Sequence, residues 1–141
     1  MSVFEKILVP LDGSEHSLNA LEKAIQIAKK FDGKITLINV YSVSSFRMTP
    51  SQVFAYVMEI RKSGESILAE GKKIAFDEGI QVETMLKEGH IVEEILQKAR
   101  EGNFDLIVMG ARGISKMKEI LLGSVSHGLT THAPCPVLVV K

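Results

Sequence analysis

The sequence contains little that would support disulfide, metal or membrane chemistry. Cys135 is the one cysteine among 141 residues, which excludes an intrachain disulfide and a cage of cysteine ligands. No apolar run approaches the ~20 residues that cross a bilayer. The first residues, MSVFEKILVPLDGSE, become charged too early for a signal peptide. We therefore expect a soluble, cytoplasmic protein without a membrane partner.

An excess of charge of one sign is also missing. Lys plus Arg number 17 and Asp plus Glu number 17, so the formal net charge is zero. A general nucleic-acid binder needs a surplus of positive charge, and we expect no nucleic-acid partner here. The four histidines share no short metal-binding spacing, so we expect no metal held by protein ligands alone.

The sequence does contain apolar strands that alternate with amphipathic helices. Short apolar or alternating runs predict strands, and apolar residues at helical spacing predict helices. Glycines that follow the helical stretches mark where those helices end. The predicted strands span 6–11, 34–41, 80–86, 104–109 and 137–140. The first predicted helix follows a cap at Asp12 or Ser14, the others begin near 50, 91 and 124, and the first three end at Gly33, Gly79 and Gly102.

One predicted helix is much longer than the others. Thr49-Pro50-Ser51-Gln52 combines a capping residue, a proline at the first helical position and a glutamine three residues after the cap. The helix that follows runs to Glu78 and carries one apolar stripe, interrupted by Gly64 and Gly71. Glycine costs roughly 1 kcal/mol in a helix relative to alanine, so these two glycines indicate close packing.

The alternation of strands and helices predicts a single α/β domain over residues 1–141. We expect a doubly wound, Rossmann-like fold: a five-stranded parallel sheet with helices on both faces. Ligands of such sheets bind beyond the carboxyl ends of the strands. The Asp12-Gly13 turn and the segment from Gly110 to Gly113 both follow strands, so they lie on the same edge.

The glycine-rich stretch GARGISKMKEILLGSVSHG predicts a phosphate site at this edge. Gly110 allows a ligand close to the backbone, and Gly123 precedes a helix whose first N–H groups attract anions. Arg112 and the hydroxyls of Ser124 and Ser126 add hydrogen-bond donors, and Lys116 and Lys118 add positive charge. The spacing G-x2-G-x9-G-S is neither a Walker A loop nor a dinucleotide G-x-G-x-x-G motif.

The whole chain resembles the universal stress protein family, in its ATP-binding branch. The resemblance rests on KILVPLDGSEHS, LINVY, DLIVMGARG, LLGSVSHGL and APCPVLVVK. The glycine pattern matches the ATP-binding signature of that branch. The resemblance implies a bound ATP, with Mg²⁺ or Mn²⁺ carried on its phosphates rather than in a protein cage.

The resemblance also implies roles for individual residues. Asp12 would hydrogen-bond the ribose, and the other positions would surround the adenine, ribose and phosphates. Around the adenine these are Pro10, Leu11 and Val40; beside the ribose and phosphates, Met109 and Gly110; and on the phosphates, Arg112, Gly113, Gly123, Ser124, Val125 and Ser126.

Local structural roles for the same residues remain open. Asp12 could cap the first helix or form an Asx turn. Gly123 and Ser124 could be a helix cap, and Arg112 could be a solvated loop charge.

Three functional classes follow from the resemblance. We expect an ATP-binding switch in stress response, in which the loop 114–122 becomes ordered on the phosphates and signals to an unknown protein partner. The alternatives are a weak ATPase, for which Glu119 is a candidate, and a nucleotide-independent scaffold. An exposed last strand would invite aggregation, so we expect a homodimer that pairs through the C-terminal strand.

Overall fold

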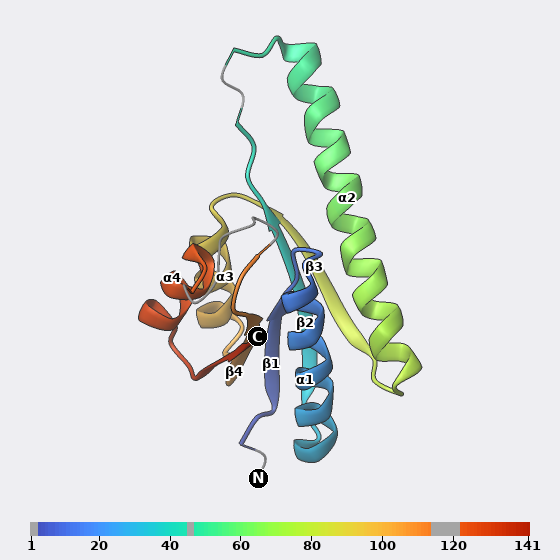
Figure 1. Ribbon diagram of the computed structural model, residues 1–141, viewed down its shortest axis with the longest axis vertical. Coiled ribbons are helices and arrows are strands. Elements are labelled where there is room, and N and C mark those ends of the chain that lie inside the picture. The colour runs from blue at the N-terminus through green and yellow to red at the C-terminus, as the bar shows by residue number, and fades with distance from the viewer. Residues whose placement is uncertain (1–2, 45–46, 114–121) are drawn as a thin grey trace.

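The fold is a five-stranded parallel sheet, as the sequence predicts. A computed structural model describes residues 3–44, 47–113 and 122–141 (Figure 1). The strands lie in the order β3-β2-β1-β4-β5, and every neighbouring pair is parallel. They span Lys6–Pro10 (β1), Lys34–Tyr41 (β2), Val82–Glu88 (β3), Leu106–Gly110 (β4) and Val137–Val140 (β5).

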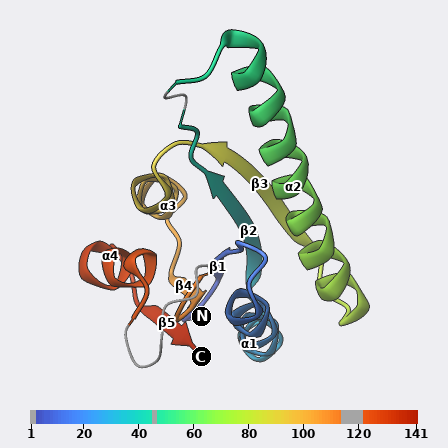
Figure 2. The ribbon, with the colours of Figure 1, turned by 45° about the horizontal axis from the view of Figure 1, so that its top comes forward.

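Helices cover both faces of the sheet. One face carries α1 (Glu15–Phe31) and α2 (Pro50–Asp77), and the other carries α3 (Ile91–Glu101) and α4 (Ser124–His132) (Figure 2). Each face has its own apolar core. Leu21 and Leu37 belong to the core under α1 and α2, while Ile95 and Ile107 belong to the core under α3 and α4. Within the described residues, no helix is long and apolar enough to span a membrane.

The strand order places the binding edge between β1 and β4. From β1 the chain moves outward to β2 and β3, and then returns to the other side of β1 for β4 and β5. The helices that follow β1 and β4 therefore leave the sheet on opposite faces. This reversal opens a crevice at the carboxyl ends of the two central strands.

The long helix α2 begins and packs as predicted. The Thr49 hydroxyl accepts the Gln52 N–H, and the Gln52 side chain accepts the Thr49 N–H, which completes a capping box. Gly64 and Gly71 are buried against the sheet and α1, where a Cβ would overlap neighbouring side chains. The first half of α2 extends beyond the sheet (Figure 1) and contains no buried residue.

The first helix ends one residue earlier than predicted. Asp32 adopts the left-handed conformation at φ 54° and its N–H donates to the Ala28 carbonyl, so Asp32 rather than Gly33 caps α1. Aspartate is one of the few residues that tolerates this conformation. The cap at the other end is Ser14, whose hydroxyl accepts the Ser17 N–H at 3.1 Å.

The strands β3 and β4 each begin two residues later than predicted. Ile80 N–H donates to the Ala75 carbonyl, and Phe104 N–H donates to the Ala99 carbonyl. These apolar residues therefore close the preceding helices before the strands start. Sequence alternation alone does not distinguish an apolar residue that closes a helix from one that starts a strand.

At Gly110 the packed backbone of α1 leaves no room for a side chain. A Cβ there would lie 2.7 Å from the His16 carbonyl carbon and 2.9 Å from the Ser17 nitrogen, both backbone atoms of α1. We predict that Gly110→Ala lowers the free energy of unfolding by about 1–3 kcal/mol, because a packed backbone cannot move as a side chain can. Urea unfolding measures this change.

The matched control is Gly113→Ala. Among the described residues its Cβ would meet only the Asp12 side chain, at 2.7 Å from Oδ2. We expect Gly113→Ala to unfold near the wild-type urea midpoint. Equal destabilisation by the two substitutions would contradict this account of the α1–β4 contact.

Candidate functional site

The twelve residues predicted for the site line one cavity of about 400 Å³. The cavity lies beyond the carboxyl ends of β1, β2 and β4, and its volume falls in the range of small-ligand pockets. The predicted residues that line it are Pro10, Leu11, Asp12, Val40, Met109, Gly110, Arg112, Gly113, Gly123, Ser124, Val125 and Ser126.

Asp12 uses one carboxylate oxygen for the local turn and presents the other at the cavity. Oδ1 accepts the Ser14 N–H at 2.9 Å, which is the Asx turn that the sequence left open. Oδ2 faces Gly113, where a Cβ would come within 2.7 Å of it. The turn therefore fixes the carboxylate beside the glycine-rich segment.

The N-terminus of α4 supplies backbone donors to the opposite wall. Gly123 is the N-cap, and its own N–H donates to the Ala111 carbonyl at 2.9 Å. The N–H groups of the first helical turn have no partner within a helix, and the described residues supply no side-chain cap. The helix dipole adds partial positive charge at this point.

The Ser126 hydroxyl has a structural role. It donates to the Gly110 carbonyl at 2.7 Å, lies 3.1 Å from the Ala111 carbonyl oxygen, and the residue is buried. This bond ties the first turn of α4 to the end of β4. The backbone N–H of Ser126, together with those of Ser124 and Val125, remains at the helix N-terminus.

The rest of the cavity is mostly apolar. Val40 and Met109 line it from β2 and β4, next to Ile38 on β2. Ile91 and Ile95 line it from α3. An apolar chamber with a carboxylate and a row of N–H groups at one side suits a ligand that has a flat apolar part and an anionic part.

Sequence reasoning missed the part of the site that α2 provides. Ile60, Ser63, Gly64 and Ile67 lie on one face of α2 and line the cavity. The apolar stripe of the predicted helix identified Ile60, Gly64 and Ile67, but not Ser63, as packing residues, and the sequence does not say which turn of a long helix covers the cavity. Arg61 links this turn of α2 to the end of β2, because its guanidinium donates to the Tyr41 hydroxyl at 3.1 Å.

Asn39 is the second omission. It lines the cavity and is only 6% exposed, within a strand that is otherwise mostly apolar. A polar amide at a buried strand position is a signal that the sequence does contain, since such groups are buried only with hydrogen-bond partners. The remaining lining residues outside the predicted set are Ser17 and Tyr41.

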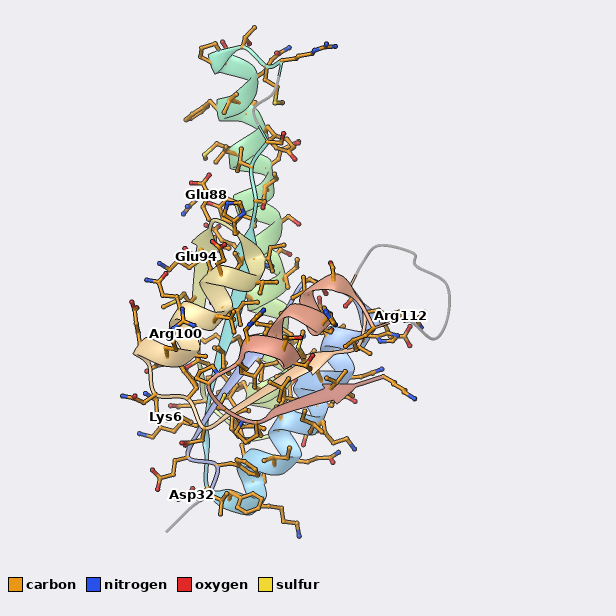
Figure 3. The ribbon with its side chains drawn as sticks, turned by 90° about the vertical axis from the view of Figure 1, so that its left-hand side faces the viewer. Lys6, Asp32, Glu88, Glu94, Arg100 and Arg112 are labelled. Carbon is orange, nitrogen blue, oxygen red and sulfur yellow. The ribbon has the colours of Figure 1, made fainter. Side chains whose placement is uncertain are left out.

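Several predicted charges fall outside the described residues. These are Lys116, Lys118 and Glu119, together with all of the loop 114–122 except Leu122. Arg112 is described; it lies near the N-terminal end of α4 and far from Lys6 and Asp32 (Figure 3). Over 3–44, 47–113 and 122–141, no group of three or more His, Cys, Asp or Glu residues could hold a metal ion.

Cys135 packs at the edge of the core under α3 and α4 and is not part of the cavity lining. Partial burial, with a smaller effect of the Asp105 carboxylate, raises the pKa of the Cys135 thiol above its usual range. Both effects disfavour the thiolate, which is the reactive form. At neutral pH the side chain is therefore a protonated thiol.

Proteins of known sequence match the chain from end to end. Universal stress protein MJ0531 of Methanocaldococcus jannaschii is 40% identical over 142 residues, which cover 99% of this chain and 84% of that protein. Universal stress protein YxiE of Bacillus subtilis is 36% identical over 148 residues, which cover 99% and 100% of the two chains.

Solved structures share the fold. The structure of MJ0577 matches with a TM-score of 0.87 and 29% identity, covering 99% of this chain and 96% of that one. A universal stress protein in complex with cAMP matches with a TM-score of 0.76 and 27% identity, covering 99% of each chain. The profile of the Universal stress protein family matches residues 4–141. The chain therefore belongs to the universal stress protein family.

Proposed function

We propose that this protein binds ATP in the cavity between β1, β4 and α4, and acts as a nucleotide-dependent switch in stress response. One observation carries the proposal. The fold gathers twelve residues from separate segments around one cavity that has a carboxylate, an apolar chamber and a helix N-terminus. These three features match the ribose, the base and the phosphates of a nucleotide.

In this proposal the ligand lies across the cavity. The adenine occupies the apolar chamber near Val40 and Leu11, and Asp12 Oδ2 accepts hydrogen bonds from the ribose hydroxyls. The phosphates lie against Gly113 and the N–H groups of Ser124 and Val125. A helix N-terminus that follows a glycine is a common anion site, because its N–H groups point at the ligand.

The relative that was solved with cAMP supports the class of ligand. Cyclic AMP shares adenine, ribose and one phosphate with ATP, so this relative is consistent with an adenine nucleotide here. The choice of ATP rests on the resemblance to the ATP-binding branch of the family, because the phosphate donors of the cavity do not themselves distinguish ATP from ADP or AMP.

A divalent cation would reach the site on the phosphates. Asp12 is the only carboxylate among the described residues that line the cavity, and a single carboxylate does not make a cation cage. Mg²⁺ or Mn²⁺ bound to the phosphates would neutralise part of their charge beside Asp12.

Hydrolysis is at most slow or dependent on a partner. Phosphoryl transfer to water needs a group that orients the attacking water. Among the described residues that line the cavity, Asp12 is the only carboxylate and no histidine is present, and this proposal assigns Asp12 to the ribose. A weak ATPase and a nucleotide-independent scaffold are the alternatives that the following experiment separates.

The test is to denature the freshly purified protein and identify the released nucleotide by mass spectrometry. We expect an adenine nucleotide from the wild type and none from a Gly123→Val, Ser124→Ala double variant. If the wild type is empty and also fails to bind added ATP with Mg²⁺, the nucleotide proposal is wrong and the scaffold alternative leads. Incubation of labelled ATP with the protein then measures turnover.

Asp12→Asn tests the ribose contact separately from the turn. The asparagine Oδ1 can still accept the Ser14 N–H, so we predict a melting temperature close to that of the wild type. Loss of the charged acceptor should weaken AMP binding roughly 10- to 100-fold, as expected for a hydrogen bond to a charged group. Isothermal titration calorimetry gives the affinity.

The control for Asp12→Asn is Asp32→Asn, at the far end of α1 (Figure 3). Asparagine also tolerates the left-handed conformation of that position. If Asp12→Asn binds AMP as tightly as the wild type does, the assignment of Asp12 to the ribose is wrong.

We also propose that the protein forms a homodimer through β5. This strand lies at the sheet edge and pairs only with β4 among the described strands. The carbonyls of Pro136 and Val140 accept hydrogen bonds from the β4 side, so by alternation the backbone groups of Val137 and Val139 face the open edge.

Val139→Pro tests this dimer. Proline removes an outward N–H and leaves the pairing of β5 with β4 in place. Light scattering coupled to size-exclusion chromatography should show a dimer for the wild type and a monomer for the variant. A wild-type monomer, or a variant that remains dimeric, would contradict pairing through β5.

A further inference from the structure

Asn39 is buried at the meeting point of three elements that enclose the cavity. It belongs to β2, one residue beyond the last pair that β2 forms with β1, and it pairs with Leu86 of β3. Strand alternation places it on the same face as Ile35 and Leu37, under α1 and α2. An amide in that position is stable only if its polar atoms find partners.

The Asn39 side chain continues the hydrogen bonding between β2 and the chain that leaves β1, beyond the last paired residues of the two strands. Beyond the end of β1, Leu11 N–H still donates to the Ile38 carbonyl at 2.9 Å. Asn39 Nδ2 then donates to the Leu11 carbonyl at 2.8 Å, in a fully buried contact. Both backbone polar groups of Leu11 are thus held by β2.

This bond fixes the direction in which the chain enters Asp12. The Leu11 carbonyl and the Asp12 N–H belong to one planar peptide unit, so a fixed carbonyl fixes the whole plane. On the other side, the Asx turn fixes Asp12 to Ser14 at 2.9 Å. The two bonds together determine where Asp12 Oδ2 points.

Helix α2 holds the amide in this orientation. A Cβ at Gly64 would lie 2.7 Å from Asn39 Oδ1, so the side-chain oxygen lies close against the helix. Gly64 is the residue of α2 that makes room for it. The amide nitrogen then faces Leu11 and donates to its carbonyl.

We infer that Asn39 is a positioning residue for the ribose site: it orients the Leu11–Asp12 peptide so that the Asp12 carboxylate meets the ribose. This inference rests on the proposed nucleotide function. It assigns ribose recognition jointly to Asp12 and to a β2 residue that does not touch the ribose.

The test compares AMP with 2′,3′-dideoxy-AMP by isothermal titration calorimetry. The wild type should prefer AMP roughly tenfold or more, because only AMP offers ribose hydroxyls to the carboxylate. In Asn39→Leu and Asn39→Asp, neither of which can donate to the Leu11 carbonyl, the preference should fall to about two- to threefold. The affinity for 2′,3′-dideoxy-AMP should change little.

The ratio of the affinities for AMP and 2′,3′-dideoxy-AMP distinguishes a positioning role of Asn39 from a purely structural one. A merely structural role would weaken both nucleotides equally and leave their ratio unchanged. Asn39→Asp keeps the size of the side chain and serves as the test if the leucine variant does not fold. Asn19→Leu is the control away from the cavity lining, since Asn19 also donates to a backbone carbonyl, that of Lys141, in an exposed contact of 3.4 Å.

The outcomes are distinct. A wild type that binds neither AMP nor ATP with Mg²⁺ overturns the proposed function itself. A wild type that prefers AMP, with the same preference in the Asn39 variants, overturns only the positioning role. A preference lost in the Asn39 variants and retained in Asn19→Leu supports it.

Discussion

The end of β4 is the point on which the rest of the site depends. At Gly110 the sheet meets the backbone of α1 so closely that a Cβ would overlap it. The Gly110 carbonyl accepts the Ser126 hydroxyl, and the next residue, Ala111, bonds through its N–H to Val140 and through its carbonyl to Gly123. Two consecutive residues thus set the positions of α1, α4 and β5 relative to one another.

This constraint explains why the cavity has its polar groups where it does. The contact at Gly110 brings the N-terminal end of α1, and with it the Asp12 turn, next to the carboxyl end of β4. The bond to Ser126 brings the first turn of α4 to the same place from the other face. A carboxylate and a helix N-terminus therefore face one another across a short span, which suits a ligand with hydroxyls at one point and phosphate at the next.

Much of this arrangement could be predicted from the sequence. The five strands, the four helices and the parallel sheet follow from hydrophobic periodicity, and the predicted site residues follow from the glycine spacing and the family resemblance. Strand starts at Val82 and Leu106 were missed, because Ile80 and Phe104 are apolar residues that close helices. The cavity residues of α2 were not predicted, because they depend on the position of this 28-residue helix along the sheet. That register is set by contacts such as Gly64 against Asn39, which link residues distant in sequence.

The most direct test of the account is the response of backbone amides to AMP, followed by ¹H–¹⁵N correlation spectroscopy. We predict the largest shifts at the N–H groups of Gly113, Ser124 and Val125, with a second group around Asp12. If these amides remain unchanged at saturating AMP and also at saturating ATP with Mg²⁺, the claim that the cavity between β1, β4 and α4 binds a nucleotide is contradicted.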